Sequence, residues 1–166
     1  MAKITLQGNA INTSGELPSV GTDAPDFVLV DSDLTNTSLK NFEGFKKILN
    51  IVPSLDTPVC QKSTKEFNAR VEKMADTVAL VITADLPFAM KRFCSTEALE
   101  SIKPLSMMRS RNFAKDYGVL ITDGPLEGIT ARAVVVLDKD DKILYTELVE
   151  EIANEPNYDD AIEAAS

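Results

Sequence analysis

Three residues of this 166-residue chain have the side chains best suited to chemistry: Cys60, Cys94 and Arg132. The chain contains no histidine, which excludes Ser-His-Asp and Cys-His catalysis, imidazole metal ligation and a near-neutral imidazole switch. Two cysteines are too few for a four-thiolate zinc or iron–sulfur site. The remaining chemistry is that of a thiol assisted by Asp, Glu, Lys, Arg, Tyr or a hydroxyl group.

Cys60 lies where a helix is expected to begin. It follows the apolar run Ile48–Val52 and the dipeptide Thr57-Pro58, in which threonine is a good N-cap and proline suits the first helical position. Cys60 would then be the third helical residue, where the helix dipole and free backbone N–H groups favour a reactive thiolate. The alternative is that Cys60 is a small, buried hydrophobic residue.

Cys94 and Arg132 are harder to interpret alone. Cys94 closes a helical pattern that begins at Leu86, and by itself it fits core packing better than chemistry. Arg132 precedes the apolar run Val134–Leu137, where a charge needs a partner or a ligand, although a surface ion pair is the simpler alternative. The chain has no Cys-x-x-Cys motif, and in a reducing compartment a bond between its two cysteines would be transient and catalytic.

The sequence pattern predicts helices and strands that form a single α/β domain over residues 1–166 and position these residues. Two continuous apolar runs, 48–52 and 78–82, have the composition of strands buried on both faces. Between them, five residues recur at the spacing of one helix face: Val59, Ser63, Phe67, Val71 and Met74. This unit is therefore a strand–helix–strand with parallel strands.

Shorter elements complete the expected fold. They are an N-terminal β-hairpin with strands at 4–6 and 10–13, a strand at 27–30, helices over 86–94 and 112–117, an antiparallel hairpin of 133–137 and 143–146, and a closing helix that starts at Pro156. Together these elements predict a mixed central sheet flanked by helices.

Charge and hydropathy limit the expected binding partners and location of the protein. The chain has 17 basic and 26 acidic residues, a formal charge of −9 that repels phosphate backbones, so nucleic-acid binding is not expected. The first residues lack the pattern of a secretory signal, and no stretch reaches the ~18 apolar residues of a membrane span. We therefore expect a soluble cytoplasmic protein that does not bind membranes.

Three blocks of the sequence resemble one known family. They are Pro-x-x-x-Thr-x-x-Cys at 53–60, the segment from Asp85-Leu86-Pro87-Phe88-Ala89 to Arg92-Phe93-Cys94, and Asp123-Gly124-Pro125-Leu126 with Ala131-Arg132-Ala133. In this order they are similar to the thiol peroxidases, the atypical two-cysteine peroxiredoxins of bacteria. The typical class is disfavoured, because no cysteine lies near the C-terminus and no Val-Cys-Pro follows the threonine. The resemblance spans nearly the whole chain and implies a thioredoxin-like fold with an N-terminal β-hairpin.

The resemblance also implies a role for each site residue. Cys60 would be the peroxidatic cysteine and Cys94 the resolving one, Thr57 and Arg132 would activate Cys60 and bind peroxide, and Pro53 would shield the site. The implied reaction reduces hydrogen peroxide and organic hydroperoxides through a Cys60 sulfenic acid and a Cys60–Cys94 disulfide, which thioredoxin recycles. A homodimer with no metal or organic cofactor, acting in antioxidant defence, is expected.

Two other roles use the same residues. A redox sensor or binding module would use the cysteine pair as a switch without turnover, and a purely structural thioredoxin-like domain would use it for packing. Sustained consumption of peroxide separates the enzyme from both.

Overall fold

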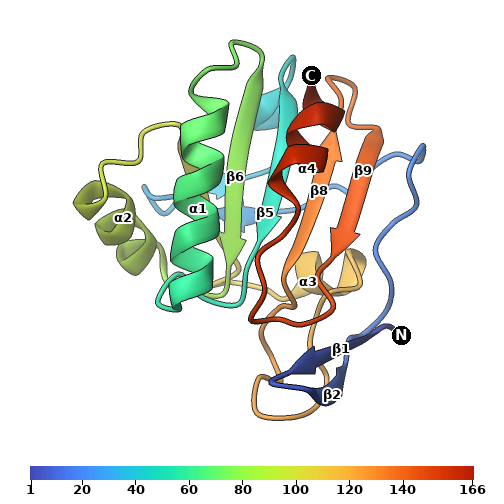
Figure 1. The fold of residues 1–166 in the computed structure, drawn as a ribbon. Helices are drawn as coiled ribbons and strands as arrows, with labels where there is room; N and C mark the ends of the chain where they lie inside the picture. The colour runs from blue at the N-terminus through green and yellow to red at the C-terminus, as the bar shows by residue number, and fades with distance from the viewer.

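The computed structural model describes residues 1–166, which form a mixed sheet and a separate hairpin. The sheet strands are β3 (Leu29–Val30), β4 (Asn36–Thr37), β5 (Lys46–Ile51), β6 (Thr77–Thr83), β7 (Ile102–Ser106), β8 (Ala133–Leu137) and β9 (Ile143–Leu148). Their order across the seven-stranded sheet is β4-β3-β7-β6-β5-β8-β9 (Figure 1). Strands β5, β6 and β7 run parallel, whereas β8 and β9 are antiparallel to their neighbours. The predicted mixed sheet is confirmed.

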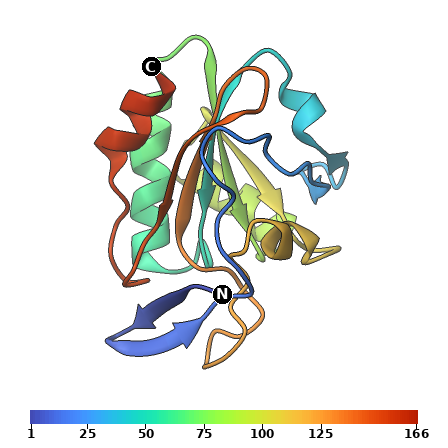
Figure 2. The same cartoon turned by 90° about the vertical axis from the view of Figure 1, so that its right-hand side faces the viewer.

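Helices cover both faces of this sheet. Figure 2 shows α1 (Pro58–Val71) and α4 (Tyr158–Ala165) on one side, and the 3₁₀ helix η1 (Leu39–Phe42) and α3 (Asn112–Asp116) on the other. The fifth helix, α2 (Pro87–Thr96), packs on β7 to the side of α1 (Figure 1). None of these helices combines the length and the apolar character that crossing a membrane requires.

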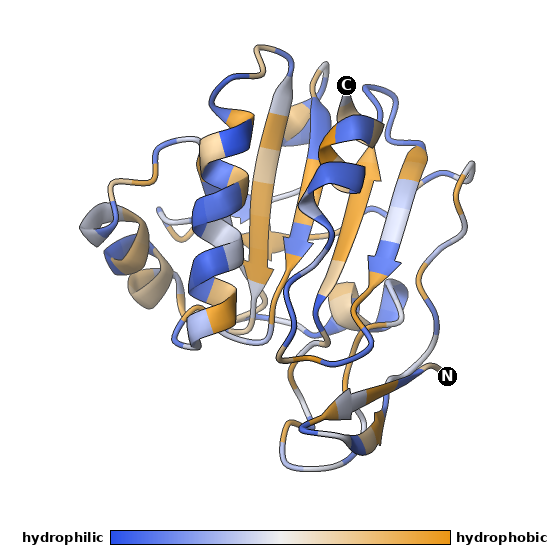
Figure 3. Ribbon diagram, viewed as in Figure 1, coloured by the Kyte–Doolittle hydropathy of each residue, from blue (hydrophilic) through white to orange (hydrophobic).

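The core is divided by the sheet into two clusters. Along β5, Ile48 packs with the α1 side and Leu49 and Ile51 pack with the α3 side, because successive strand residues point to opposite faces. In Figure 3 the central strands are accordingly apolar along most of their length, while the outer surfaces of α1 and α4 are polar. Strands buried on both faces explain the continuous apolar runs of the sequence.

The helix after β5 is confirmed, and most of its predicted face is buried. Met74 lies beyond the end of α1, and Val59 is only half-buried. Ser63, Phe67 and Val71 of the predicted face are buried, and Cys60 is buried with them. Strict four-residue steps drift by about 40° per step around a helix of 3.6 residues per turn, so Val59, at one end of the set, lies toward the side of the buried face.

Strand β7 was not predicted, because Pro104 interrupts its pattern. It pairs with β6 along its whole length but with β3 only at Val30–Ser106. The Met107 N–H donates to the Thr83 carbonyl at 2.9 Å, so strand alternation directs Pro104 to the opposite, outer edge, where its missing N–H breaks no ladder bond. Proline at this position therefore marks an unpaired edge inside the fold.

Two other predicted boundaries are corrected. The strand expected over 27–30 is shorter and consists only of Leu29–Val30, β3. Phe27 lies before it and packs edge-on against Phe113, with ring centroids 5.5 Å apart. The last helix starts after Asn157, whose side chain accepts the Asp160 N–H, rather than at Pro156. In both cases a side-chain contact that the local pattern does not reveal sets the boundary.

The N-terminal hairpin is confirmed as β1 (Lys3–Leu6) and β2 (Asn9–Asn12), which lie below the main sheet in Figure 1. The Asp123 carboxylate accepts from the Asn12 backbone N–H at 2.8 Å and from its side-chain amide at 2.7 Å. These hydrogen bonds lower the pKa of Asp123. The hairpin is thus attached to the loop that precedes β8.

We expect Asp141→Asn to destabilise the fold more than Lys47→Met. Lys47 is fully buried in β5, and its ammonium binds the Asp141 carboxylate at 2.5 Å. Removing the carboxylate leaves a buried cation unpaired, which costs about 3 kcal/mol, whereas an apolar side chain of similar length is nearly neutral. Urea unfolding of both variants measures the difference, and equal losses of stability would contradict this account of the ion pair.

Candidate active site

Cys60 lies in the first turn of α1, directly beyond the carboxyl end of β5. The helix begins at Pro58 with Thr57 in extended conformation as its N-cap, so Cys60 is the third helical residue, as predicted. Its side chain is fully buried. The position combines the positive end of the helix dipole with free backbone N–H groups, which can stabilise negative charge that develops during a reaction.

The Thr57 hydroxyl does not cap the helix as the sequence suggested. It donates to the carbonyl of Ser54 at 3.0 Å, and the Thr57 backbone N–H donates to the same carbonyl at 3.2 Å. The turn at 54–57 brings this carbonyl closer to the hydroxyl than the helical N–H groups. Because the hydroxyl hydrogen is used in this way, the Thr57 oxygen can face a ligand only as a hydrogen-bond acceptor.

Arg132 reaches Cys60 through the register of the sheet. Ile51 pairs with Ala133, which sets Arg132 opposite Val52, the last residue before the loop that leads to Cys60. The Arg132 Nη2 donates to the Cys60 Sγ at 3.4 Å, and its Nε donates to the carbonyl of Ile152 at 2.9 Å. The surface ion pair considered from the sequence is therefore wrong.

One nitrogen of this arginine has no hydrogen-bond partner. Arg132 is only 2% exposed, and its Nη1 makes no hydrogen bond. A buried guanidinium donor without a partner is costly, and most buried polar groups in folded proteins are paired. The site therefore offers an unused donor beside a buried sulfur.

Two side-chain hydroxyl groups form hydrogen bonds to the first turn of α1. The Cys60 carbonyl accepts from the Ser63 hydroxyl at 3.1 Å and from the Thr64 hydroxyl at 2.7 Å. The Ser63 hydroxyl also contacts the side-chain amide of Asn50 on β5, at 3.4 Å. Such back-bonding competes with the regular helical ladder and makes this turn easier to deform.

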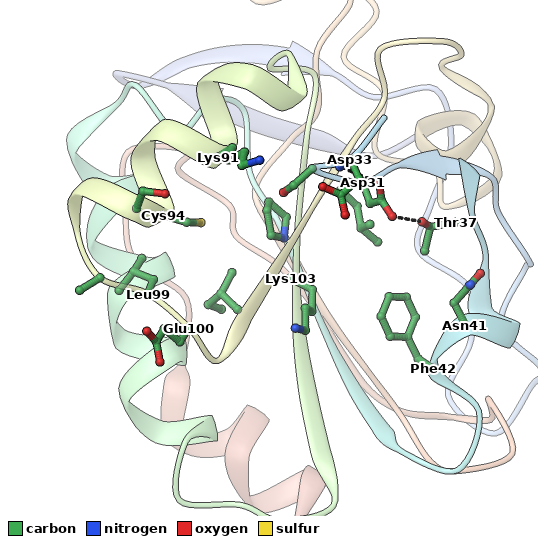
Figure 4. A pocket seen from close by; sticks show the side chains of 16 residues that line it. Asp31, Asp33, Thr37, Asn41, Phe42, Lys91, Cys94, Leu99, Glu100 and Lys103 are labelled. Carbon is green, nitrogen blue, oxygen red and sulfur yellow. Dashed lines mark hydrogen bonds between the residues drawn. The ribbon is translucent and has the colours of Figure 1, made fainter. Parts of the chain in front are cut away.

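Pro53 lies in the loop that leads from β5 to Cys60. Cys94, in contrast, lies away from Cys60 and Arg132. Pro53 is buried next to Val52, whose carbonyl accepts the Thr130 hydroxyl at 3.1 Å. Cys94 is half-buried on α2 and lines a groove of about 770 Å³ with Lys91 and other residues (Figure 4).

The two cysteines are free thiols, and Cys60 does not line the groove that Cys94 faces. Burial raises the pKa of the Cys94 thiol, which makes it a weak nucleophile in this conformation. The folded site therefore favours reaction at Cys60 over reaction at Cys94.

Sequence reasoning missed the contacts of Asp85. This residue follows β6 and was noted only as part of a family-like block. Its carboxylate accepts from the hydroxyls of Ser54 and Thr83, both at 2.8 Å, and from the backbone N–H of Leu55 at 2.7 Å. A polar residue at the carboxyl end of a parallel strand was the available signal, because ligand sites of open α/β sheets lie at that edge.

Comparisons with known proteins extend over the whole chain. The Redoxin family profile matches residues 19–162. A thiol peroxidase of Mycobacterium tuberculosis (strain ATCC 25618 / H37Rv) is 52% identical over 164 residues, which cover 99% of this chain and 98% of that protein. A thiol peroxidase of Leptospira interrogans (serovar Lai) is 51% identical over 168 residues, with 100% and 98% covered.

Solved structures agree with this relationship. A peroxiredoxin-like protein from Aquifex aeolicus has a TM-score of 0.93 at 40% identity, and the match covers 99% of this chain and 96% of that one. A thiol peroxidase from Chromobacterium violaceum has a TM-score of 0.90 at 28% identity, with 97% and 93% covered. The thioredoxin-like fold expected from the sequence is confirmed. The chain therefore belongs to the Redoxin family, and within it to the thiol peroxidases.

Proposed function

We propose that this chain is a single-domain thiol peroxidase that reduces hydrogen peroxide and organic hydroperoxides with Cys60. The observation that carries the proposal is the unpartnered Nη1 of Arg132, buried beside the Cys60 sulfur. A hydroperoxide oxygen would accept from this donor, while the hydroperoxide O–H would donate to the Thr57 oxygen. Full-length relatives named thiol peroxidases support the same reaction.

The reaction at Cys60 is a nucleophilic displacement on oxygen. The thiolate attacks the terminal oxygen of the hydroperoxide: an S–O bond forms, the O–O bond breaks, and Cys60 becomes a sulfenic acid. The departing hydroxide or alkoxide takes up a proton to give water or an alcohol. Arg132 keeps its charge throughout, so its donors stabilise both the thiolate and the negative charge that develops on the leaving oxygen.

The second step joins the two cysteines. The Cys94 thiol attacks the Cys60 sulfenic acid, a disulfide forms and water leaves; a reduced dithiol protein such as thioredoxin then returns both thiols by exchange. A disulfide needs Cα atoms within ~4.4–6.8 Å. Because the two cysteines are on different helices and Cys60 does not line the groove that Cys94 faces, we infer that at least one helix unwinds locally to join them. Unwinding that exposes Cys94 also removes the burial that raises its pKa.

The setting of the enzyme follows from the same features. We infer a reducing compartment, the cytoplasm, because the cycle starts from two free thiols. A homodimer is supported by the exposed apolar side chains of Leu86 and Phe88, which flank the first residue of α2. A purely structural domain gives no reason for an unpartnered arginine donor in the core, and a sensor would react without sustained turnover.

Coupled turnover tests the proposal directly. With thioredoxin, thioredoxin reductase, NADPH and a hydroperoxide, we expect continuous NADPH oxidation by the wild type and none above background by Cys60→Ser. Cys94→Ser should reduce one equivalent of peroxide and then stop, because the sulfenic acid cannot be resolved. A single stoichiometric oxidation of the wild type, with no further turnover, would instead identify a sensor.

Substitution of Arg132 tests the electrostatic part of the mechanism. We expect Arg132→Met to lower the rate of peroxide reduction ~10²–10³-fold, as removal of an oxyanion donor does in other enzymes. Arg132→Lys should also be impaired, because an ammonium lacks the planar fork of donors. Stopped-flow single-turnover measurements on folded variants give the rates, and near-normal kinetics in Arg132→Met would refute the assignment.

Hydrogen exchange tests local unwinding. In the disulfide form we expect lost protection at residues 57–62, at 88–96, or at both, because one cysteine must leave its helix to reach the other. The central strands β5 and β6 serve as an internal control, since their buried amides should exchange slowly in both forms. Unchanged protection of both cysteine segments would rule out unwinding.

A further inference from the structure

The polar contacts that fix residues 54–57, the loop that enters the Cys60 helix, converge on one carboxylate, while the buried side chain of Leu55 adds apolar packing. The hydrogen bonds that leave this loop, apart from the helical bond of the Thr57 carbonyl, end on Asp85: the Ser54 hydroxyl at 2.8 Å and the Leu55 N–H at 2.7 Å. A further link, from Asp56 to Arg92 at 3.8 Å, joins two side chains that are about 70% exposed and adds little. Asp85 is thus the main polar anchor of the loop.

Asp85 is itself held by hydrogen bonds just beyond the carboxyl end of strand β6. Its carboxylate accepts from the Thr83 hydroxyl, and its backbone N–H donates to the same hydroxyl oxygen at 2.7 Å. Its carbonyl accepts from the Ser106 hydroxyl at the end of β7. Asp85 therefore fixes the loop relative to the ends of strands β6 and β7 rather than relative to another loop.

Ser54 transmits this position to Thr57. Its hydroxyl hydrogen is directed at Asp85, and its hydroxyl oxygen accepts the Asp56 N–H at 3.2 Å. Its carbonyl, oriented by these contacts, accepts the Thr57 hydroxyl at 3.0 Å. The Asp85 carboxylate can only accept, which makes the Ser54 hydroxyl a donor, and the Ser54 carbonyl can only accept, which makes the Thr57 hydroxyl a donor.

We propose that Asp85 is a positioning residue for peroxide reduction, which acts through Ser54 to keep the Thr57 hydroxyl oxygen turned toward the hydroperoxide as an acceptor. This inference rests on the proposed peroxidase function. The loop needs a carboxylate, because three donors converge on its two oxygens. An amide would place its N–H₂ group either against the Leu55 N–H, which breaks that anchoring bond, or against the Ser54 hydroxyl, which reverses the direction of that bond.

Two reactions of the Cys60 thiolate separate positioning from general damage. In a Cys94→Ser background, we expect Asp85→Asn to slow the reaction with hydrogen peroxide about tenfold or more, the equivalent of losing one ordinary hydrogen bond in the transition state. Alkylation by iodoacetamide uses the same thiolate but carries no hydroperoxide O–H for Thr57 to accept. Its rate should change less than about twofold.

Asp138→Asn is the matched control. Asp138 is also a half-buried aspartate, and it accepts from the backbone N–H groups of Asp140 and Lys142 at 2.8 and 2.9 Å in the turn between β8 and β9. The substitution removes the same charge and should leave both Cys60 reactions unchanged. If Asp85→Asn does not fold, Ser54→Ala provides the same test, because it breaks the series on the loop side and leaves the Leu55 and Thr83 contacts of Asp85.

A double-mutant cycle tests the route. Because Asp85 acts through Thr57, Asp85→Asn should slow the peroxide reaction less than about twofold when Thr57→Val is already present. Equal slowing of peroxide reduction and alkylation, additive effects of the two substitutions, or no slowing would overturn the role of Asp85 while leaving the peroxidase intact. A wild type that does not reduce peroxide would overturn both proposals.

Discussion

The contact between Arg132 and Cys60 is the interaction on which the rest of this structure depends. It joins residues 72 positions apart, and it exists because β8 pairs with β5 in one register. A slip of one residue would turn every side chain of β8 to the opposite face of the sheet and carry the arginine away from the thiol. Every residue of β8 is apolar and buried, so a slip would disturb the packing on both faces of the sheet, and the core that stabilises the fold also aligns the site.

A charged group in this position restricts its neighbours. The guanidinium is almost completely buried, and it is tolerated because a backbone carbonyl and a sulfur accept two of its donors. The third guanidinium nitrogen, Nη1, has no partner within the protein, and the proposed substrate would provide one. The two thiols accordingly have different environments, since Cys60 has a cation beside it, whereas the thiol of Cys94 has its pKa raised by burial alone.

Local features of the site could be predicted from the sequence, and non-local ones could not. Thr57-Pro58 indicates a helix start through its own backbone preferences, so the third-residue position of Cys60 followed directly. The partner of Arg132 depends on strand register, and the direction of the Thr57 hydroxyl depends on a turn three residues earlier. Strand β7 could not be predicted because a local signal is misleading there: a proline normally argues against a strand. Pro104 is tolerated because its nitrogen faces an unpaired edge of β7.

The unpaired edge of β7 has a consequence for the state of the protein in concentrated solution. An open strand edge is a template on which a second chain can add a strand, and this leads to aggregation. The edge borders the groove beside α2, so any unwinding of that helix would expose more of it. Pro104 removes a donor from the edge, and the neighbouring Lys103 adds a charge, two features that natural sheets use against edge-to-edge association. The same proline that conceals the strand in the sequence thus protects this edge against self-association.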